Sequence, residues 1–586
     1  MTQSRTHNCN ELRLANAGEK VTLVGWFENV RKVSKNLGFV ILRDFYGTTQ
    51  LVIETEDMMA IIDSLNKETT ISATGIVRER SSKNKDLPTG EIEVVPEKIE
   101  ILGKCRYNAL PFEITKSTEA DENTRLKYRY LDLRNPEVKK SIVIRSQIVA
   151  ELRNAMINHG FLEITTPILT ASSPEGARDY LVPARNHPGK FYALPQAPQQ
   201  FKQLLMTAGF DRYFQIAPCF RDEDARADRS PGEFYQMDME MAFASQEDIF
   251  AVIEDVLPPI FAKYGVYKTA SKAPFVRIPY REAMDKYGSD KPDLRIDLVL
   301  QDATKVMADC GFEPFAGKVV KAVVVDKLNA TRKQIDAMIA DVEVTTAQKT
   351  YWFRVDENGE FVGGISKFLA DRKQAVIDAL GLKNGDFVGL AAGDLLTAQK
   401  TAGVFRKLLG AAAEGHMDKE KYEFCWIVDF PMYEIGEESG ELEFCHNPFS
   451  MPKGGLEALK TQDPLDILAY QYDLVVNGVE LSSGAIRNHD PEIMVEAFKL
   501  VRLGEEDVKA KFPAMYNAFC YGAPPHGGIA PGVDRMVMLI LGKDAIRDVI
   551  AFPMNKNAQD LMMGAPAEVT QKQLDEDHIA IVMPEK

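Results

Sequence analysis

The chain lacks several features that would assign it to particular classes of protein. Its seven cysteines are scattered and none forms a Cys-x-x-Cys pair, so the sequence predicts neither a disulfide framework nor a cysteine-based zinc site. No apolar run reaches the roughly 18 residues of a membrane helix. The start of the chain also has no basic segment followed by an apolar one. We therefore expect no signal peptide, no membrane partner, and a reducing, cytoplasmic location.

Basic residues are also outnumbered by acidic ones. The 586 residues include 86 Asp and Glu against 70 Lys and Arg, which gives a formal net charge of −16. This balance counts against a protein that coats nucleic acid nonspecifically, and we expect no DNA partner. Local basic surfaces on an acidic body remain compatible with it. The composition is otherwise that of an ordinary globular protein, and the length suffices for about four domains.

The most informative stretch lies between residues 212 and 241. Two β-prone segments, 212–220 and 234–241, flank a highly charged one, so the sequence predicts a hairpin. Alternation in the second segment places Gln236, Asp238 and Glu240 on one face and apolar residues on the other. A polar face of this kind is costly to bury unless a cation or polar ligand meets it. The alternative interpretation is a solvated hairpin with a surface charge run.

Two further segments supply cations that suit an anionic ligand. Arg221 stands at the end of the first β-prone segment, where a guanidinium can clamp a phosphate. Residues 197–209 form a predicted helix in which Gln199, Lys202 and Gln203 share one face. A lysine on a helix is more often simply solvated, so this pattern alone does not decide between a ligand site and an ordinary surface.

The segment 472–487 is β-prone and contains a pair of carboxylates. Asp473 and Glu480 are an odd seven positions apart, so they do not share a face of one straight strand. A bend at Asn477 and Gly478 would bring them together. Two carboxylates beside a phosphate suggest Mg²⁺.

Residues 524–542 read as a glycine-rich strand that enters an apolar helix. Gly528 and Gly532 permit close backbone approach. Arg535 follows at the predicted start of the helix, where it can meet an anion.

Residues 1–105 are β-rich. Five short β-prone runs and one helical stretch near residues 58–66 fit an OB-fold barrel. Phe39 lies on a predicted strand between clusters of basic residues, and an aromatic platform with nearby cations is how such barrels hold single-stranded bases. The alternative is that Phe39 belongs to the core and the basic residues are ordinary surface.

Three segments of the chain resemble the motifs of the class II aminoacyl-tRNA synthetases. Phe220-Arg221-x-Glu223 and its hairpin resemble motif two, the helix and proline of residues 136–170 resemble motif one, and Gly532-x-Asp534-Arg535 resembles motif three. The amino-acid sequence is similar to that of the bacterial aspartyl-tRNA synthetases over nearly the whole chain. The resemblance implies an α+β multidomain protein with an N-terminal OB-fold β-barrel, a class II antiparallel-sheet catalytic domain and an inserted α/β domain of the GAD type.

The same resemblance implies domain boundaries. The expected order is an anticodon-binding barrel (1–105), a hinge (106–135), the first part of the catalytic domain (136–295), the GAD-type insertion (296–424), the second catalytic part (425–560) and a C-terminal extension (561–586).

The function that the resemblance implies is ATP-dependent attachment of L-aspartate to tRNA(Asp) through an aspartyl-adenylate. Mg²⁺ would be the cofactor, ATP a substrate, and the protein a homodimer. A non-discriminating enzyme that also aspartylates tRNA(Asn) is an open alternative, as is a noncatalytic RNA-binding relative. Lys202 together with Arg487 argues against relatives that charge asparagine or lysine, because a neutral side chain would leave these cations underpaired and a cationic one would be repelled.

The implied site residues fall into four sets. The aspartate-binding set is Glu175, Gln199, Lys202, Arg221, Gln236, Asp238, His446 and Arg487. The ATP-binding set is Arg221, Asp222, Glu223, Phe234, Glu480, Gly532, Val533, Asp534 and Arg535. The magnesium ligands are Asp473 and Glu480, and the anticodon contacts are Arg31, Phe39 and Gln50. The chain departs from many family members in a motif-two loop that is one residue longer at 230–232, and in Asn447, where a second histidine is common.

Overall fold

The structure is a computed structural model that describes residues 4–172, 177–227, 229–326, 328–436 and 439–583. The chain forms two compact units. The first consists of Met1–Lys139 with Leu561–Met563, and the second of Lys140–Asp560 with Gly564–Lys586. No helix within the described residues is long and apolar enough to cross a membrane.

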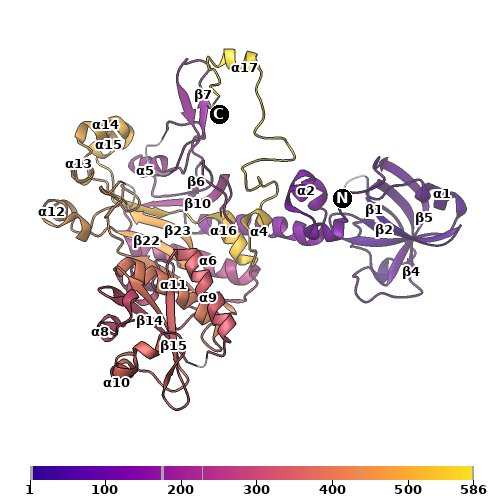
Figure 1. Cartoon of the computed structure of the whole chain (residues 1–586). Helices are drawn as coiled ribbons and strands as arrows, with labels where there is room; N and C mark the ends of the chain where they lie inside the picture. The colour runs from indigo at the N-terminus through magenta and orange to yellow at the C-terminus, as the bar shows by residue number, and fades with distance from the viewer. Residues whose placement is uncertain (1–3, 173–176, 228, 327, 437–438, 584–586) are drawn as a thin grey trace. The chain divides into compact units, whose positions relative to one another are not determined.

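The first unit contains a closed barrel with strand order β1-β2-β3-β5-β4 (Figure 1). Its elements are β1 (Lys20–Ser34), β2 (Leu37–Arg43), β3 (Thr48–Ile53), α1 (Glu56–Asp63), β4 (Thr70–Glu79) and β5 (Ile92–Gly103). Alternate apolar residues such as Leu23, Val40 and Ile71 fill the interior, as the period of two in a strand requires. The barrel predicted for this part of the chain is confirmed.

Buried charges attach the segment after the barrel to the barrel itself. Arg43 at the end of β2 pairs with Glu28 at 2.8 Å and with Glu68 at 2.5 Å. Arg134, far along the chain, pairs with the same Glu68 at 2.7 Å and lies 4.7 Å from the centre of the Trp26 ring. Breaking a buried ion pair is costly because it leaves a charge uncompensated. These ion pairs tie Arg134, which lies in the same unit, to the barrel.

The second unit is built on a sheet with strand order β12-β19-β22-β23-β24-β10-β9-β6. The strands from β19 to β9 run antiparallel to their neighbours, whereas the short edge strands β12 and β6 run parallel to theirs. Their bounds are β6 (Leu162–Glu163), β9 (Arg212–Arg221), β10 (Gly232–Ala242), β12 (Val276–Pro279), β19 (Phe424–Val428), β22 (Gln471–Val476), β23 (Val479–Ile486) and β24 (His526–Ile529). The antiparallel-sheet fold and the hairpin of residues 212–241 are confirmed.

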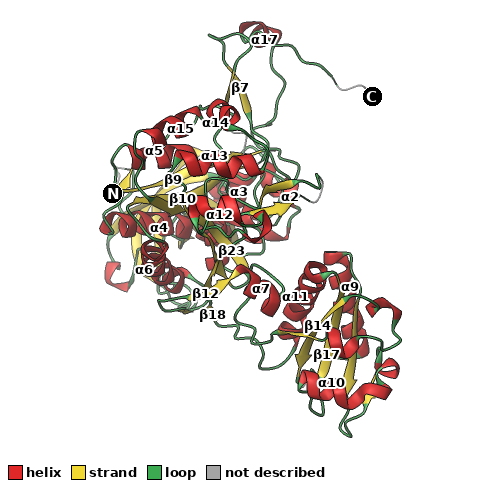
Figure 2. Cartoon of the chain, turned by 90° about the vertical axis from the view of Figure 1, so that its left-hand side faces the viewer, coloured by secondary structure: helices red, strands yellow, loops and turns green. Residues whose placement is uncertain are grey.

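Helices cover one face of this sheet and form the main core with it. They are α4 (Pro136–Asn158), α6 (Gln246–Tyr264) and α16 (Val533–Ile540). Figure 2 shows α4 and α6 beneath β9 and β10. Leu152, Leu257 and Val537 join strand residues in one buried cluster, and Phe250 stacks on Trp426 with ring centres 3.9 Å apart. The core therefore fixes which face of the sheet is left for a ligand.

A second sheet, β13-β14-β17-β15-β16, forms between β12 and β19 in the sequence. Its elements are β13 (Leu300–Asp302), α8 (Thr304–Met307), β14 (Val319–Val325), α9 (Arg332–Thr346), β15 (Thr350–Val355), β16 (Phe361–Val362), α10 (Lys373–Leu380), β17 (Phe387–Gly393) and α11 (Leu395–Ala412). One buried cluster packs α9 and α11 on the sheet, and another packs α8 and α10 on it. The insertion combines helices with a sheet, as expected, but all of its strand pairs are antiparallel, whereas an α/β domain would have a mainly parallel sheet.

The barrel's close packing yields a testable prediction at Gly75. A Cβ atom there would lie 2.0 Å from the Val95 carbonyl oxygen and 2.6 Å from Pro96 Cα, at a register shift between β4 and β5. We expect Gly75→Val to destabilise the barrel by about 1–3 kcal/mol, as overpacking typically does. Hydrogen–deuterium exchange should accelerate in β4 and β5 and stay unchanged in β9 and β10.

The matched control is Lys98→Val, which adds a branched side chain at an exposed position of β5. Its exchange in the barrel should match that of the wild type. Unchanged exchange in Gly75→Val would contradict the close approach of these strands.

Candidate active site

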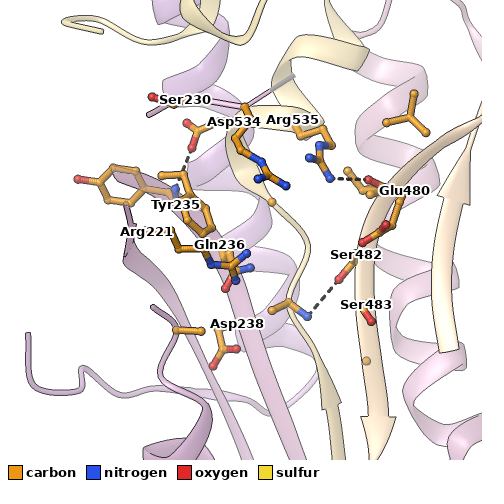
Figure 3. A pocket seen from close by; sticks show the side chains of 18 of the residues that line it. Arg221, Ser230, Tyr235, Gln236, Asp238, Glu480, Ser482, Ser483, Asp534 and Arg535 are labelled. Carbon is orange, nitrogen blue, oxygen red and sulfur yellow. Dashed lines mark hydrogen bonds between the residues drawn. The ribbon is translucent and has the colours of Figure 1, made fainter. Parts of the chain in front are cut away.

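A polar cleft of about 500 Å³ opens on the second unit. Strand β10 walls one side, β23 the other, and the start of α16 closes one end (Figure 3). The cleft brings together predicted residues from distant segments: Gln199, Lys202, Arg221, Glu223, Phe234, Gln236, Asp238, Glu480, Arg487, Gly532, Asp534 and Arg535.

Strand β10 supplies one wall because its residues alternate between the two faces of the sheet. Met237 and Met239 are buried in the core that the helices form. Asp238 and Glu240 therefore point to the opposite face, as predicted from the sequence. Both carboxylates are fully buried there, so they require cationic partners.

Those partners form the buried ion network, which consists of Lys202, Asp238, Glu240 and Arg487. Lys202, on α5 (Gln199–Thr207), lies 2.7 Å from Asp238 and 3.3 Å from Glu240. The Arg487 Nε donates to Glu240 at 2.9 Å. Arg487 is thus held by Glu240. Glu240 was missed as a site residue, although its place in the alternation gave the signal.

Charge balance sets the protonation of this network. Burial raises the pKa of Asp238, and the contact with Lys202 only partly offsets it. Burial also opposes ionisation of Glu240, but Arg487 and Lys202 outweigh it and hold the pKa of that carboxyl below its usual range. The Lys202 ammonium and the Arg487 guanidinium therefore face two carboxyl groups of unequal acidity.

Gly528 on β24 lets the backbone approach the network closely, as predicted. A Cβ atom at this position would lie 2.1 Å from the Glu240 Oε2 and 2.1 Å from the Met239 carbonyl oxygen. At Gly532, in contrast, the nearest described atom to an added Cβ would be the Arg535 Cβ, at 3.8 Å. The protein's own packing therefore requires glycine at 528 but leaves space at 532.

The start of α16 is tied to both walls of the cleft (Figure 3). Asp534 accepts a hydrogen bond from the Tyr235 backbone at 2.8 Å and forms an ion pair with Arg145 on α4. Arg535 donates to the Glu480 carbonyl oxygen at 2.8 Å. Asp534 is thereby engaged in holding α16, and Val533 is buried in the core and does not line the cleft.

Not all of the predicted ATP-binding residues of the motif-two hairpin line the cleft. The Arg221 guanidinium lies 4.9 Å from the centre of the Phe234 ring, and both line the cleft. Glu223 also lines it and pairs with Arg229. Asp222 instead lies 3.7 Å from Arg178 and does not line the cleft.

The expected bend between the two carboxylates is present. Asn477 and Gly478 have φ angles of 51° and 77° and join β22 to β23 in a tight hairpin. Glu480 pairs with Val475 across the hairpin, which puts Glu480 on the face that Asp473 also occupies. Asp473 is fully buried, and burial together with Glu480 raises its pKa.

This carboxylate pair fits a hard divalent cation. Asp473 Oδ1 has no hydrogen-bond partner among the described residues, so it is an available oxygen ligand. No group of three or more His, Cys, Asp or Glu side chains among those residues has metal-binding geometry. Mg²⁺ needs no such group, because it usually binds one or two carboxylates and completes its shell with water and phosphate.

Two of the remaining predicted residues, Asp473 and His446, do not line the cleft. His446 lines a separate cavity of about 750 Å³, packs edge-to-face on Phe430, and has its pKa lowered by burial. Glu175 lies outside the described residues. Lys291, which the sequence reasoning did not single out, lines the cleft and lies 2.8 Å from Glu480.

The three predicted anticodon residues share one face of the barrel. Arg31 pairs with Phe39 across β1 and β2, and its guanidinium lies 4.9 Å from the ring centre. Gln50 is opposite Ile41, two residues from Phe39 on β2. It donates to Glu93 at 3.1 Å and accepts from Arg80 at 3.0 Å. A half-buried aromatic ring beside fixed polar groups is suited to stacking a base.

Comparisons with known proteins agree with this geometry. Residues 121–556 match the family model "tRNA synthetases class II (D, K and N)", and residues 21–102 match "OB-fold nucleic acid binding domain". An "Aspartate--tRNA ligase" of Streptomyces coelicolor is 51% identical over 591 residues, covering 100% of both chains. The chain belongs to the bacterial aspartyl-tRNA synthetases. An "Aspartate--tRNA(Asp/Asn) ligase" of Zymomonas mobilis is 53% identical and covers 99% of this chain and 98% of that one.

Solved structures of the wider class share the fold. A putative aspartyl-tRNA synthetase from Leishmania major has a TM-score of 0.59 at 20% identity and covers 94% of both chains. An asparaginyl-tRNA synthetase from Pyrococcus horikoshii, complexed with asparaginyl-adenylate, has a TM-score of 0.58 at 18% identity. It covers 94% of this chain and 98% of that one.

The crowding at Gly528 gives a test of the site's packing. We expect Gly528→Ala to lower the free energy of unfolding by about 1–3 kcal/mol, because the added methyl group displaces Glu240 from Arg487. Gly532→Ala, at the N-cap of α16, is the matched control and should stay within about 0.5 kcal/mol of the wild type. Thermal unfolding of both variants measures the difference. Equal stability of the two would mean that Glu240 is not packed against β24 as described.

Proposed function

We propose that this cleft carries out the two steps of an aspartate--tRNA ligase. In the first, the α-carboxylate of aspartate attacks the α-phosphate of ATP and forms aspartyl-adenylate and pyrophosphate. In the second, the terminal adenosine hydroxyl of the tRNA takes the aspartyl group. The attacking carboxylate is already charged, so the first step needs positioning and charge neutralisation, not a protein nucleophile. The buried ion network is the observation that carries this proposal.

The network supports selection of aspartate by charge. Lys202 and Arg487 are positioned to bind the side-chain carboxylate, while Asp238 and Glu240 hold the two cations in place. Asparagine offers no negative charge, so it would form no ion pair with Lys202 or Arg487 and would bind less tightly than aspartate. The remaining aspartate contacts are proposed for Gln199, Arg221 and Gln236, which line the cleft, and for Glu175 on the strength of the family resemblance. His446, which lines a separate cavity, is left out of this set.

ATP is proposed to lie between the motif-two hairpin and the start of α16. Arg221 would hold the α-phosphate and Phe234 would stack on the adenine, which suits two groups that already lie in contact. Glu223 would hold the adenine amino group. Arg535, fixed by the Glu480 carbonyl, would hold the terminal phosphate. Gly532, which lines the cleft beside Arg535, is proposed to contact ATP directly. Asp534 is proposed to act indirectly by holding α16 in place, whereas Asp222 and Val533 do not line the cleft.

Asp473 and Glu480 are proposed to hold Mg²⁺. An available buried oxygen on Asp473 and a half-buried carboxylate on Glu480 suit this ion. When bound, Mg²⁺ would neutralise negative charge on the phosphates. The chain's own contribution is to hold both carboxylates on one face of the β22–β23 hairpin.

The partners are proposed from exposed surfaces. Arg31, Phe39 and Gln50 would contact the anticodon of tRNA(Asp). A homodimer is proposed through the motif-one region, where the apolar side chains of Leu162, Ile168 and Leu169 are exposed. All seven cysteines are free thiols, which supports a reducing, cytoplasmic location.

A second candidate is an enzyme that also aspartylates tRNA(Asn). The name of the Zymomonas mobilis relative, "Aspartate--tRNA(Asp/Asn) ligase", favours it. Charging of tRNA(Asp) and tRNA(Asn) transcripts in separate reactions with ATP, Mg²⁺ and aspartate decides between the two. We expect aspartyl-tRNA(Asp) to form in either case, and aspartyl-tRNA(Asn) only for a non-discriminating enzyme. Charging of neither transcript by folded protein would contradict the proposed function and favour a noncatalytic RNA-binding role.

The aspartate pocket can be tested at Lys202. We expect Lys202→Met to reduce aspartate-dependent pyrophosphate exchange at least about 100-fold, because it removes a buried cation from two carboxylates and from the substrate. Lys460→Met, at an exposed position of α12 (Gly455–Thr461), is the control and should retain exchange. Exchange in Lys202→Met close to that of the wild type would exclude Lys202 from the pocket.

A further inference from the structure

Lys291 pairs with Glu480 from outside the three synthetase motifs. Its Nζ lies 2.8 Å from Glu480 Oε2, and its side chain is 41% exposed against 28% for Glu480. The Lys291 ammonium neutralises the negative charge of the Glu480 carboxylate by this direct contact. An ammonium thus stands at the oxygen that the proposed metal would need.

The loop that carries Lys291 is packed against the turn that forms the carboxylate pair. Helix α7 (Tyr280–Tyr287) ends at Gly288, which has a φ of 66°, and residues 288–295 follow. A Cβ atom at Gly478 would lie 3.0 Å from the Asp293 Cβ, so this loop touches the β22–β23 turn directly. The position of Lys291 is therefore linked to that of Glu480.

The insertion holds both ends of the same loop through α11. At one end Gly403 and Gly288 cross in close contact, since a Cβ atom at Gly403 would lie 2.4 Å from the Gly288 carbonyl oxygen. At the other end the buried Arg406 donates to the carbonyl oxygens of Asp293 at 3.2 Å and Ile296 at 2.7 Å. Through these contacts the insertion packs directly against the loop that carries Lys291 beside the cleft.

We propose that Lys291 is an exchangeable counter-cation for Asp473 and Glu480, held in place by the insertion. Lys291 neutralises the carboxylates when the cleft holds no metal, and a divalent cation must displace it from Glu480. The triphosphate of ATP is the anion that receives the released ammonium. A free divalent cation therefore binds weakly, and metal and nucleotide bind together. The inference rests on the proposed ATP and magnesium site.

The physical reason is repulsion between cations. Two positive groups cannot both approach Glu480 closely in a half-buried site without a large electrostatic cost, since charges there interact several-fold more strongly than in water. Removing the ammonium removes this competition and leaves two carboxylates underneutralised. Both changes increase the affinity of the two carboxylates for the metal ion.

The test measures binding of Mn²⁺ alone, by electron paramagnetic resonance, to the full chain without nucleotide. We expect Lys291→Met to bind Mn²⁺ about tenfold more tightly than the wild type. Lys291→Arg keeps the cation and should bind as the wild type does. The matched control is Lys286→Met on α7, whose lysine pairs with Glu282 at 2.7 Å on the exposed surface and should leave Mn²⁺ binding unchanged. Equal or weaker Mn²⁺ binding by Lys291→Met would overturn the proposal.

A second measurement separates the role of Lys291 from the proposed function. In pyrophosphate exchange at saturating Mg²⁺, we expect Lys291→Met to raise the KM for ATP about tenfold and to leave the KM for aspartate unchanged. An unchanged KM for ATP would overturn the transfer of Lys291 to the triphosphate. Absence of exchange in the wild type would overturn the proposed function itself, whereas Mn²⁺ binding does not depend on activity.

The connection to the insertion is tested by Gly403→Ala. The added methyl group would separate α11 from Gly288 and so shift the Lys291 loop. We expect tighter Mn²⁺ binding, in the same direction as Lys291→Met and smaller in size. Wild-type Mn²⁺ affinity in a folded Gly403→Ala protein would overturn the positioning role of the insertion.

Discussion

The burial of opposite charges on the polar face of β10 is the constraint on which the site depends. Asp238 and Glu240 are fully buried, and they are tolerable there only because Lys202 and Arg487 reach them from α5 and from the end of β23. The core on the other face fixes the direction of these carboxylates by burying Met237 and Met239. Core packing and charge pairing are thus two consequences of one strand's alternation.

Close backbone contacts turn this network into a defined pocket. Gly528 allows β24 to approach Glu240, and the β22–β23 turn at Asn477 and Gly478 sets the second group of carboxylates opposite β10. The start of α16 joins both walls through Asp534 and Arg535. The cleft is consequently rich in fixed charges before any ligand binds, which suits a reaction that depends on positioning and charge neutralisation.

The insertion between β12 and β19 has a structural connection to this cleft. Gly403 and Arg406 hold the loop of residues 288–295, and that loop carries Lys291. A segment that the sequence left without any chemistry therefore bears on the carboxylate pair through packing. The connection uses a glycine crossing and backbone carbonyls, neither of which has a recognisable sequence motif.

Sequence alone determined the elements with strong periodicity: the barrel strands, the β9–β10 hairpin and the strand-to-helix turn ending at Arg535. It also placed Asp238 and Glu240 on one face, because alternation in a strand is a local property. Only the tertiary structure decided which charges meet. It assigned Glu240 to Arg487, turned Asp222 toward Arg178, kept His446 out of the cleft and brought Lys291 to Glu480. Such pairings join residues far apart in the chain, and no local pattern encodes the distance between them.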